Sequence, residues 1–222
     1  TNEHLRAEIV VETRNARFIR ECRDRYPLHD YKRLAPLMDR LRVIKDAVEL
    51  EQLQKAIDLT ESGFRRVLNF IKPGVGEWEI EAEYLHEFVR KRSKGFAYPP
   101  IIGTGKNACV LHYLDNNTIC EDGQMVLMDV GAEWANWNAD MTRTVPVNGR
   151  FTDRQRDVYN SVLRVQRGSM DFLRPGVTQQ EWRDHTIELM EVELIRLGLI
   201  DAEEAKRQDP REQPLVKKYY MH

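Results

Sequence analysis

The stretch Phe70-Ile71-Lys72-Pro73-Gly74-Val75 is the most informative one in this chain, because it returns 102 residues later as Phe172-Leu173-Arg174-Pro175-Gly176-Val177. Four of the six positions are identical, and the other two are like-for-like exchanges. Pro-Gly is a common helix stop, so one copy alone would carry little information. Two copies, each between two predicted helices, indicate a duplicated α+β unit, and a period of about 100 residues is too long for a solenoid.

The helices around each copy are predicted from apolar periodicity and from capping residues. A long helix begins after residue 46 and ends at the first Pro-Gly, and an amphipathic run from 77 to about 94 follows. The second copy separates helices that begin near residues 153 and 179, and short helical stretches at 5–25 and 31–41 precede the first unit. The predicted capping pairs are Asp46 with Glu49, Thr152 with Gln155, and Thr178 with Glu181.

Between the two helix pairs the pattern changes to short apolar segments separated by Gly, Asn and Asp, which is typical of strands and turns. Helices that flank a block of strands favour an α+β fold over a parallel doubly wound sheet. The predicted strand segments are 101–102, 108–113, 125–130 and 141–147.

Composition excludes several classes of partner. The chain has 34 Lys and Arg against 36 Asp and Glu, a net charge of −2, which argues against binding to nucleic acid or to an anionic membrane. No apolar run approaches the ~20 residues that a membrane-spanning helix needs, and no signal peptide is evident. Three cysteines without metal-type spacing fit a reducing compartment. We therefore expect a cytoplasmic protein without nucleic-acid or membrane partners.

Two aspartates provide the strongest chemical signal. Asp129 ends an apolar strand segment, and Asp140 precedes the next one. A hairpin that turns at Trp134-Ala135 would place the two directly opposite each other, with Cβ atoms ~4.5–5.5 Å apart. Two carboxylates this close repel unless a cation lies between them, and they suit a pair of divalent metals. The alternative, which spacing alone leaves open, is that one Asp caps a turn and the other pairs with Arg143.

The other motifs are weaker. His112 lies in an apolar run, where a lone histidine is more often a core residue than a catalyst, and His222 beside two tyrosines is unremarkable by itself. The segment Gly103-Thr104-Gly105-Lys106 lacks the spacing of a phosphate-binding loop, and no Gly-x-Ser-x-Gly elbow is present. Nucleophilic catalysis by a side chain has no support.

Taken together, these segments resemble the aminopeptidase P and prolidase family, the metallopeptidases with the pita-bread (creatinase/aminopeptidase) fold. The resemblance covers roughly residue 40 to the end, and its ordered set of motifs is specific where each motif alone is not. The matching segments are 41–45, 100–103, 105–108, 111–113, 128–133, 139–144 and 220–222.

The resemblance implies a pseudo-twofold α+β fold, which accounts for the Pro-Gly echo. By position, Asp129 would be the bidentate ligand of one metal ion and Asp140 the bridging ligand. His112 would bind substrate and stabilise the tetrahedral intermediate, and His222 would match a second substrate-facing histidine. Family members generally use two divalent ions, most often Mn²⁺ and otherwise Co²⁺ or Zn²⁺, which hold the hydroxide that attacks the bond before proline.

The chain also departs from the family pattern. A third ligand, four residues past His222, and two later glutamates would lie beyond the last residue. We therefore expect an incomplete catalytic domain at 43–222 with its C-terminal part missing, inactive and weak in metal binding by itself. Residues 1–42 would be the tail of a preceding N-terminal domain and a linker helix.

The predicted activity of the parent protein is that of an Xaa-Pro aminopeptidase, acting on peptides with proline in second position, and the full-length protein is expected to be a homo-oligomer. A dipeptide-restricted prolidase is not excluded by these residues. A non-catalytic pita-bread module that binds peptide or protein, or a metal-free creatine-hydrolysing relative, is disfavoured because both Asp129 and Asp140 are present.

Overall fold

The computed structural model describes residues 12–207 and 215–220. The chain divides into two compact units, Thr1–Glu51 and Gln52–His222, and each is described by itself. Within the described residues, no helix is long and apolar enough to cross a membrane. The predicted domain boundary after residue 42 stays a prediction.

The first unit contains two short helices and the start of a long one. Helix α1 (Arg14–Arg25) is capped by Thr13, whose hydroxyl accepts from the Ala16 amide, and it ends at Tyr26 before a proline. Helix α2 is Ala35–Arg42. Neither helix buries a side chain. Helix α3 (Ala47–Phe70) begins at the predicted capping pair, since Asp46 and Glu49 each accept from the other's amide at 2.9 and 2.8 Å.

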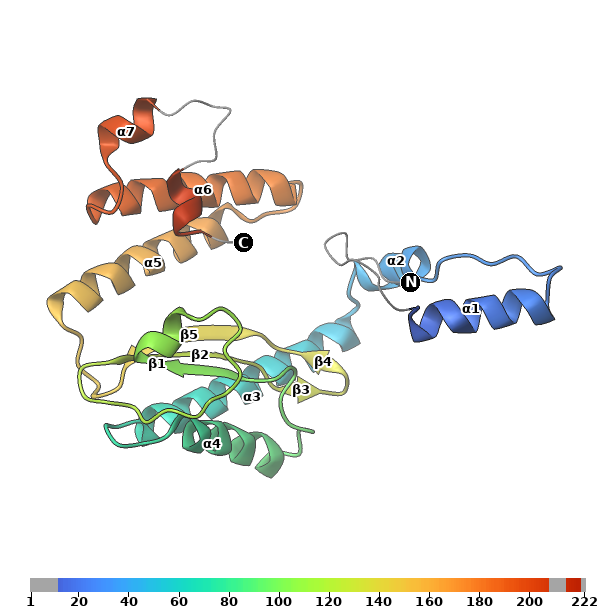
Figure 1. The fold of residues 1–222 in the computed structure, drawn as a ribbon, viewed down its shortest axis with the longest axis horizontal. Coiled ribbons are helices and arrows are strands. Elements are labelled where there is room, and N and C mark those ends of the chain that lie inside the picture. The colour runs from blue at the N-terminus through green and yellow to red at the C-terminus, as the bar shows by residue number, and fades with distance from the viewer. Residues whose placement is uncertain (1–11, 208–214, 221–222) are drawn as a thin grey trace. The chain divides into compact units, whose positions relative to one another are not determined.

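The second unit is built on an antiparallel sheet of three strands in the order β1-β2-β5, and α3 and α4 (Glu77–Arg90) pack against one face of it (Figure 1). The strands are β1 (Ile101–Thr104), β2 (Met125–Val130) and β5 (Met141–Pro146). Strand β2 alternates, so Val126, Met128 and Val130 are buried in the core with α3 and α4. Its residues Met125, Leu127 and Asp129 therefore belong to the opposite face.

The Pro-Gly echo marks two turns of the same geometry. In the first, the Val75 amide donates to the Lys72 carbonyl at 3.2 Å, and in the second the Val177 amide donates to Arg174 at 3.1 Å. Gly74 and Gly176 have φ of 93° and 97°, a conformation that favours glycine. The second turn joins α5 (Asp153–Phe172) to α6 (Gln179–Arg196). Both helices begin at their predicted capping boxes, so the duplicated helix pair is confirmed.

The remaining elements are short. A ribbon of β3 (Glu133–Trp134) and β4 (Trp137–Asn138) follows β2, and α7 (Ala202–Arg207) and the 3₁₀ turn η2 (Leu215–Lys218) follow α6. A second, smaller core joins Leu194 of α6 to Ile200 and to Val216 of η2.

The predicted strand at 108–113 is wrong. These residues form the end of the 3₁₀ turn η1 (Gly105–Cys109) and an irregular loop, in which Val110 and Leu111 are 54% and 55% exposed. A short apolar run does not by itself distinguish a strand from other structure. Here the polar groups of the loop bind one buried side chain, Glu77, in place of a neighbouring strand.

Candidate metal centre

The hairpin register differs from the predicted one. Strand β2 pairs with β5 so that Asp129 lies opposite Thr142 and not opposite Asp140. The turn is at Ala135-Asn136, one residue later than predicted, and both residues have positive φ, 51° and 66°. A two-residue hairpin turn of this kind needs positive φ at both central positions, which Asn tolerates well. Moving the turn by one residue shifts the pairing by two, so the two aspartates are diagonal neighbours on one face.

The two carboxylates nevertheless converge, because one hydroxyl reaches both. The Tyr98 hydroxyl donates to Asp129 Oδ1 at 2.6 Å and lies 3.2 Å from Asp140 Oδ1. Asp129 is half-buried and Asp140 is exposed. The predicted proximity of the two acids is therefore correct, although the direct cross-strand pairing is not.

A glycine allows this approach. Gly131 follows β2, and a Cβ atom at this position would lie 1.8 Å from the carbonyl oxygen of Ala139, the residue before Asp140. The Ala139 amide donates to the Ala132 carbonyl at 3.1 Å. The backbones on the two sides of the ribbon thus meet closely where each carries its aspartate, and only glycine fits there.

Tyr98 is the residue that sequence reasoning missed. It precedes Pro99-Pro100 and β1, a signal too general to reveal a contact with residues more than 30 positions away. Burial, the hydrogen bond to Asp129 and the negative charges of both aspartates raise the pKa of Tyr98 above its ordinary value. The phenol therefore stays protonated and acts as a donor to the carboxylate pair.

Of the two predicted histidines, only His112 lies within the described residues. His112 lies in the exposed loop after η1 with φ of 53°, an uncommon backbone conformation for a residue other than glycine. His222 lies outside the described residues. The alternative partner for the acids, Arg143, donates instead to the carbonyl of its neighbour Thr142 at 2.7 Å.

The donor set fits a divalent metal in part. Carboxylate oxygens from two chain segments meet at one point, and hard oxygen ligands suit Mn²⁺ and similar ions. Across residues 12–207 and 215–220, however, no group of three or more His, Cys, Asp or Glu side chains could hold an ion. The pair Asp129 and Asp140 could therefore supply two ligands and not a complete site.

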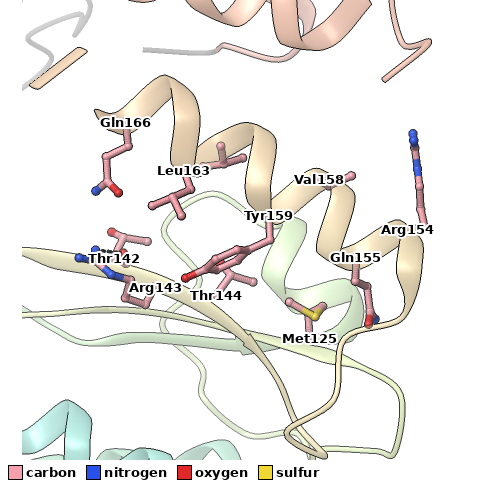
Figure 2. Close-up of a pocket in the computed structure, with 11 residues that line it drawn as sticks. Met125, Thr142, Arg143, Thr144, Arg154, Gln155, Val158, Tyr159, Leu163 and Gln166 are labelled. Carbon is pink, nitrogen blue, oxygen red and sulfur yellow. Dashed lines mark hydrogen bonds between the residues drawn. The ribbon is translucent and has the colours of Figure 1, made fainter. Parts of the chain in front are cut away.

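A cavity of about 640 Å³ lies between α5 and the sheet (Figure 2). Figure 2 shows Tyr159 and Leu163 of α5 directed toward Thr142 and Thr144 of β5. Thr142 is the cross-strand partner of Asp129, so the cavity adjoins the face that carries the acid. Neither aspartate lines it.

Comparison with known proteins identifies the family. The sequence model of metallopeptidase family M24 matches residues 51–222. The chain belongs to metallopeptidase family M24. It is 35% identical over 187 residues to the Xaa-Pro aminopeptidase of Haemophilus influenzae. This alignment covers 84% of the chain and 43% of the relative. The Xaa-Pro aminopeptidase of Escherichia coli is 35% identical over 165 residues, with 74% and 37% covered.

Solved structures agree with the M24 assignment. Proline aminopeptidase P II from Yersinia pestis matches with a TM-score of 0.80 and 31% identity, over 93% of this chain and 47% of that one. Aminopeptidase P from Escherichia coli in its low-pH form matches with a TM-score of 0.74 and 34% identity, over 76% and 38%. The α+β pita-bread fold is thus confirmed for this M24 chain, which spans less than half the length of the curated relatives named above.

Proposed function

We propose that the protein carrying this chain is a metal-dependent Xaa-Pro aminopeptidase. It would hydrolyse the bond between an N-terminal residue and a following proline. Membership in family M24 and 35% identity to two Xaa-Pro aminopeptidases support the proposal. The observation that carries it is the convergence of Asp129 and Asp140 on the Tyr98 hydroxyl.

In this proposal the described residues hold two carboxylates where metal ions would bind. Asp129 and Asp140 would supply two of the carboxylate ligands, and Tyr98 would hold both in place by hydrogen bonding. Divalent ions supply Lewis acidity for the scissile carbonyl and lower the pKa of the attacking water. His112 and His222 would bind the substrate and stabilise the tetrahedral intermediate. We further propose Mn²⁺ as the preferred ion, ahead of Co²⁺ or Zn²⁺, and a cytoplasmic homo-oligomer.

The test uses the full-length protein with Mn²⁺ and Xaa-Pro peptides of different lengths. Asp129→Asn removes a ligand charge and should abolish measurable cleavage, together with stoichiometric Mn²⁺ uptake in calorimetry. Asp171→Asn, which changes an exposed aspartate on α5, is the matched control and should leave both unchanged. Wild-type protein that binds no Mn²⁺ would contradict the proposal and favour a binding module. Cleavage confined to dipeptides would indicate a prolidase.

A further inference from the structure

Glu77 is a fully buried carboxylate outside the aspartate pair. It is the first residue of α4 and is 0% exposed. Its Oε1 accepts from the Thr104 amide at 2.7 Å and from Asn107 Nδ2 at 3.2 Å. Its Oε2 accepts from the Tyr113 hydroxyl and from the Thr118 amide, both at 2.9 Å. A buried carboxylate is costly unless it is hydrogen-bonded, and here two donors serve each oxygen.

The four donors bracket His112 in the sequence. Two precede it, from Thr104 at the end of β1 and Asn107 in η1, and two follow it, from Tyr113 and Thr118. The loop is therefore closed on a single side chain that belongs to a packed helix. His112 itself has φ of 53°, and a residue keeps such a conformation only where its surroundings determine it. Tyr113, the next residue, is buried and bonded to Glu77.

A second anchor ties the same loop to the segment that carries Tyr98. The Asn116 side chain accepts from the Ile102 amide at 3.0 Å and donates to the Pro100 carbonyl at 3.0 Å. It also donates to Glu81 of α4 at 2.8 Å. Pro100 is two residues after Tyr98. The first turns of α4 thus connect the His112 loop with the chain that reaches Asp129 and Asp140.

We propose that Glu77 is a positioning residue for His112. It holds both ends of the loop, so that the backbone at position 112 is preorganised and the imidazole is presented at a fixed place. The proposal rests on the proposed function, in which His112 contacts the substrate. Because misplacement of a catalytic group by about 1 Å can cost up to ~100-fold in rate, a change at Glu77 should appear in kcat.

The test is a double-mutant cycle in the full-length protein with Mn²⁺. Glu77→Gln turns one acceptor into a donor that faces two donors, and should lower kcat by about 10- to 100-fold. His112→Ala should lower kcat by itself, and adding Glu77→Gln to it should cause no further loss. Unchanged kcat in Glu77→Gln, or losses that multiply in the double variant, would overturn the proposal. An inactive wild type would instead refute the proposed function.

Two further variants separate positioning from folding. Tyr113→Phe removes one donor to Glu77 and keeps the buried ring, and should lower kcat about fivefold in wild type and not in His112→Ala. This variant decides the matter if Glu77→Gln does not fold. Glu79→Ala is the matched control, because Glu79 lies on the same helical turn but accepts from the Gly76 amide at 2.7 Å. It should lower the melting temperature and leave kcat unchanged, and an equal loss of kcat would contradict the proposal.

Discussion

The helix pairs α3–α4 and α5–α6 share a turn and a cap but differ in what they bury. Three positions that are 102 residues apart are buried in both pairs: Leu59 and Ser161, Val67 and Ser169, Tyr84 and Thr186. The first member of each couple is apolar or aromatic and lies in the main core, whereas the second carries a small hydroxyl. At these three positions the duplication preserves burial and not the chemistry of the side chain.

The two helix pairs bury different side chains because they pack against different surroundings. Helices α3 and α4 pack against the sheet, which offers apolar side chains from β1 and β2. In the second pair the hydroxyls bond between and within the helices, as Ser169 does with Thr186. Apolar side chains elsewhere on this pair stay exposed, with Val162 at 63% and Val192 at 66%. Local signals thus reproduce the turn, while burial of large side chains requires a second layer.

The largest expected change in the free energy of unfolding is at the equivalent positions Tyr84 and Thr186. Tyr84→Ala removes a fully buried ring and should lower the free energy of unfolding by about 3–5 kcal/mol. Thr186→Ala removes a hydroxyl and one methyl group and should cost only about 1 kcal/mol. Urea denaturation measures both. Equal losses would mean that the two pairs are packed alike.

The next largest effect is expected when a glycine at the helix contact of each pair is replaced by alanine. A Cβ at Gly63 would lie 2.7 Å from Phe88 and 2.8 Å from Tyr84, two buried rings, so Gly63→Ala should cost about 1–3 kcal/mol. A Cβ at Gly168 would meet only the Leu189 side chain, with its methyl at 2.9 Å, which can move aside. Gly168→Ala should therefore be neutral or stabilising by up to ~1 kcal/mol, from helix propensity. A large loss at Gly168 in thermal melts would contradict this difference.

The turns should respond alike. Gly74 and Gly176 have nearly equal positive φ, and a Cβ at either position would meet no atom within 4 Å. Alanine at either position should therefore lower the free energy of unfolding by the backbone term alone, about 1–2 kcal/mol. Denaturation of the two single variants side by side tests this. A difference above ~1 kcal/mol would show that tertiary contacts differ even at the shared turn.

The smallest expected effect is on the pH dependence of the melting temperature. Arg164 of α5 donates to Glu193 of α6 at 2.6 Å, and this hydrogen bond, with those from Arg196 and Ser161, lowers the pKa of Glu193 to about 2 against the effect of burial. In the first pair burial opposes ionisation of Glu87, but Ser62 and Lys91 lower its pKa to about 2 as well. Ser62 and Arg164 are again 102 residues apart.

A carboxyl with a depressed folded-state pKa stabilises the protein above its unfolded pKa of about 4.5, and this contribution is lost as pH falls toward 2. Arg164→Met should raise the folded-state pKa of Glu193, so that the melting temperature is lower near neutral pH and falls less between pH 4.5 and pH 2 than in the wild type. Arg154→Met is the control, since Arg154 lies 4.0 Å from Asp157 on the same helix. An unchanged pH profile for Arg164→Met would exclude this ion pair as a source of acid sensitivity.

Much of the fold follows from local sequence. Capping pairs such as Thr178 with Glu181 determine where helices begin, and Pro-Gly determines where they end, because both act through neighbouring backbone groups. Local sequence predicts only part of the candidate site. It predicts that Asp129 and Asp140 lie close together, but it places the hairpin turn one residue too early, because the position of the turn depends on which residues adopt positive φ.

The sequence by itself determined the α+β class, the duplicated helix pairs and the two aspartates, because periodicity, capping and a rare acid in an apolar strand are properties of nearby residues. Only the tertiary structure decided the strand register, the Tyr98 bridge between the acids and the closure of the His112 loop on Glu77. The Tyr98 bridge and the Glu77 contacts join residues 27 or more positions apart, such as Glu77 with Thr104 and Tyr98 with Asp129, and such contacts form only when the helix pair and the sheet have packed.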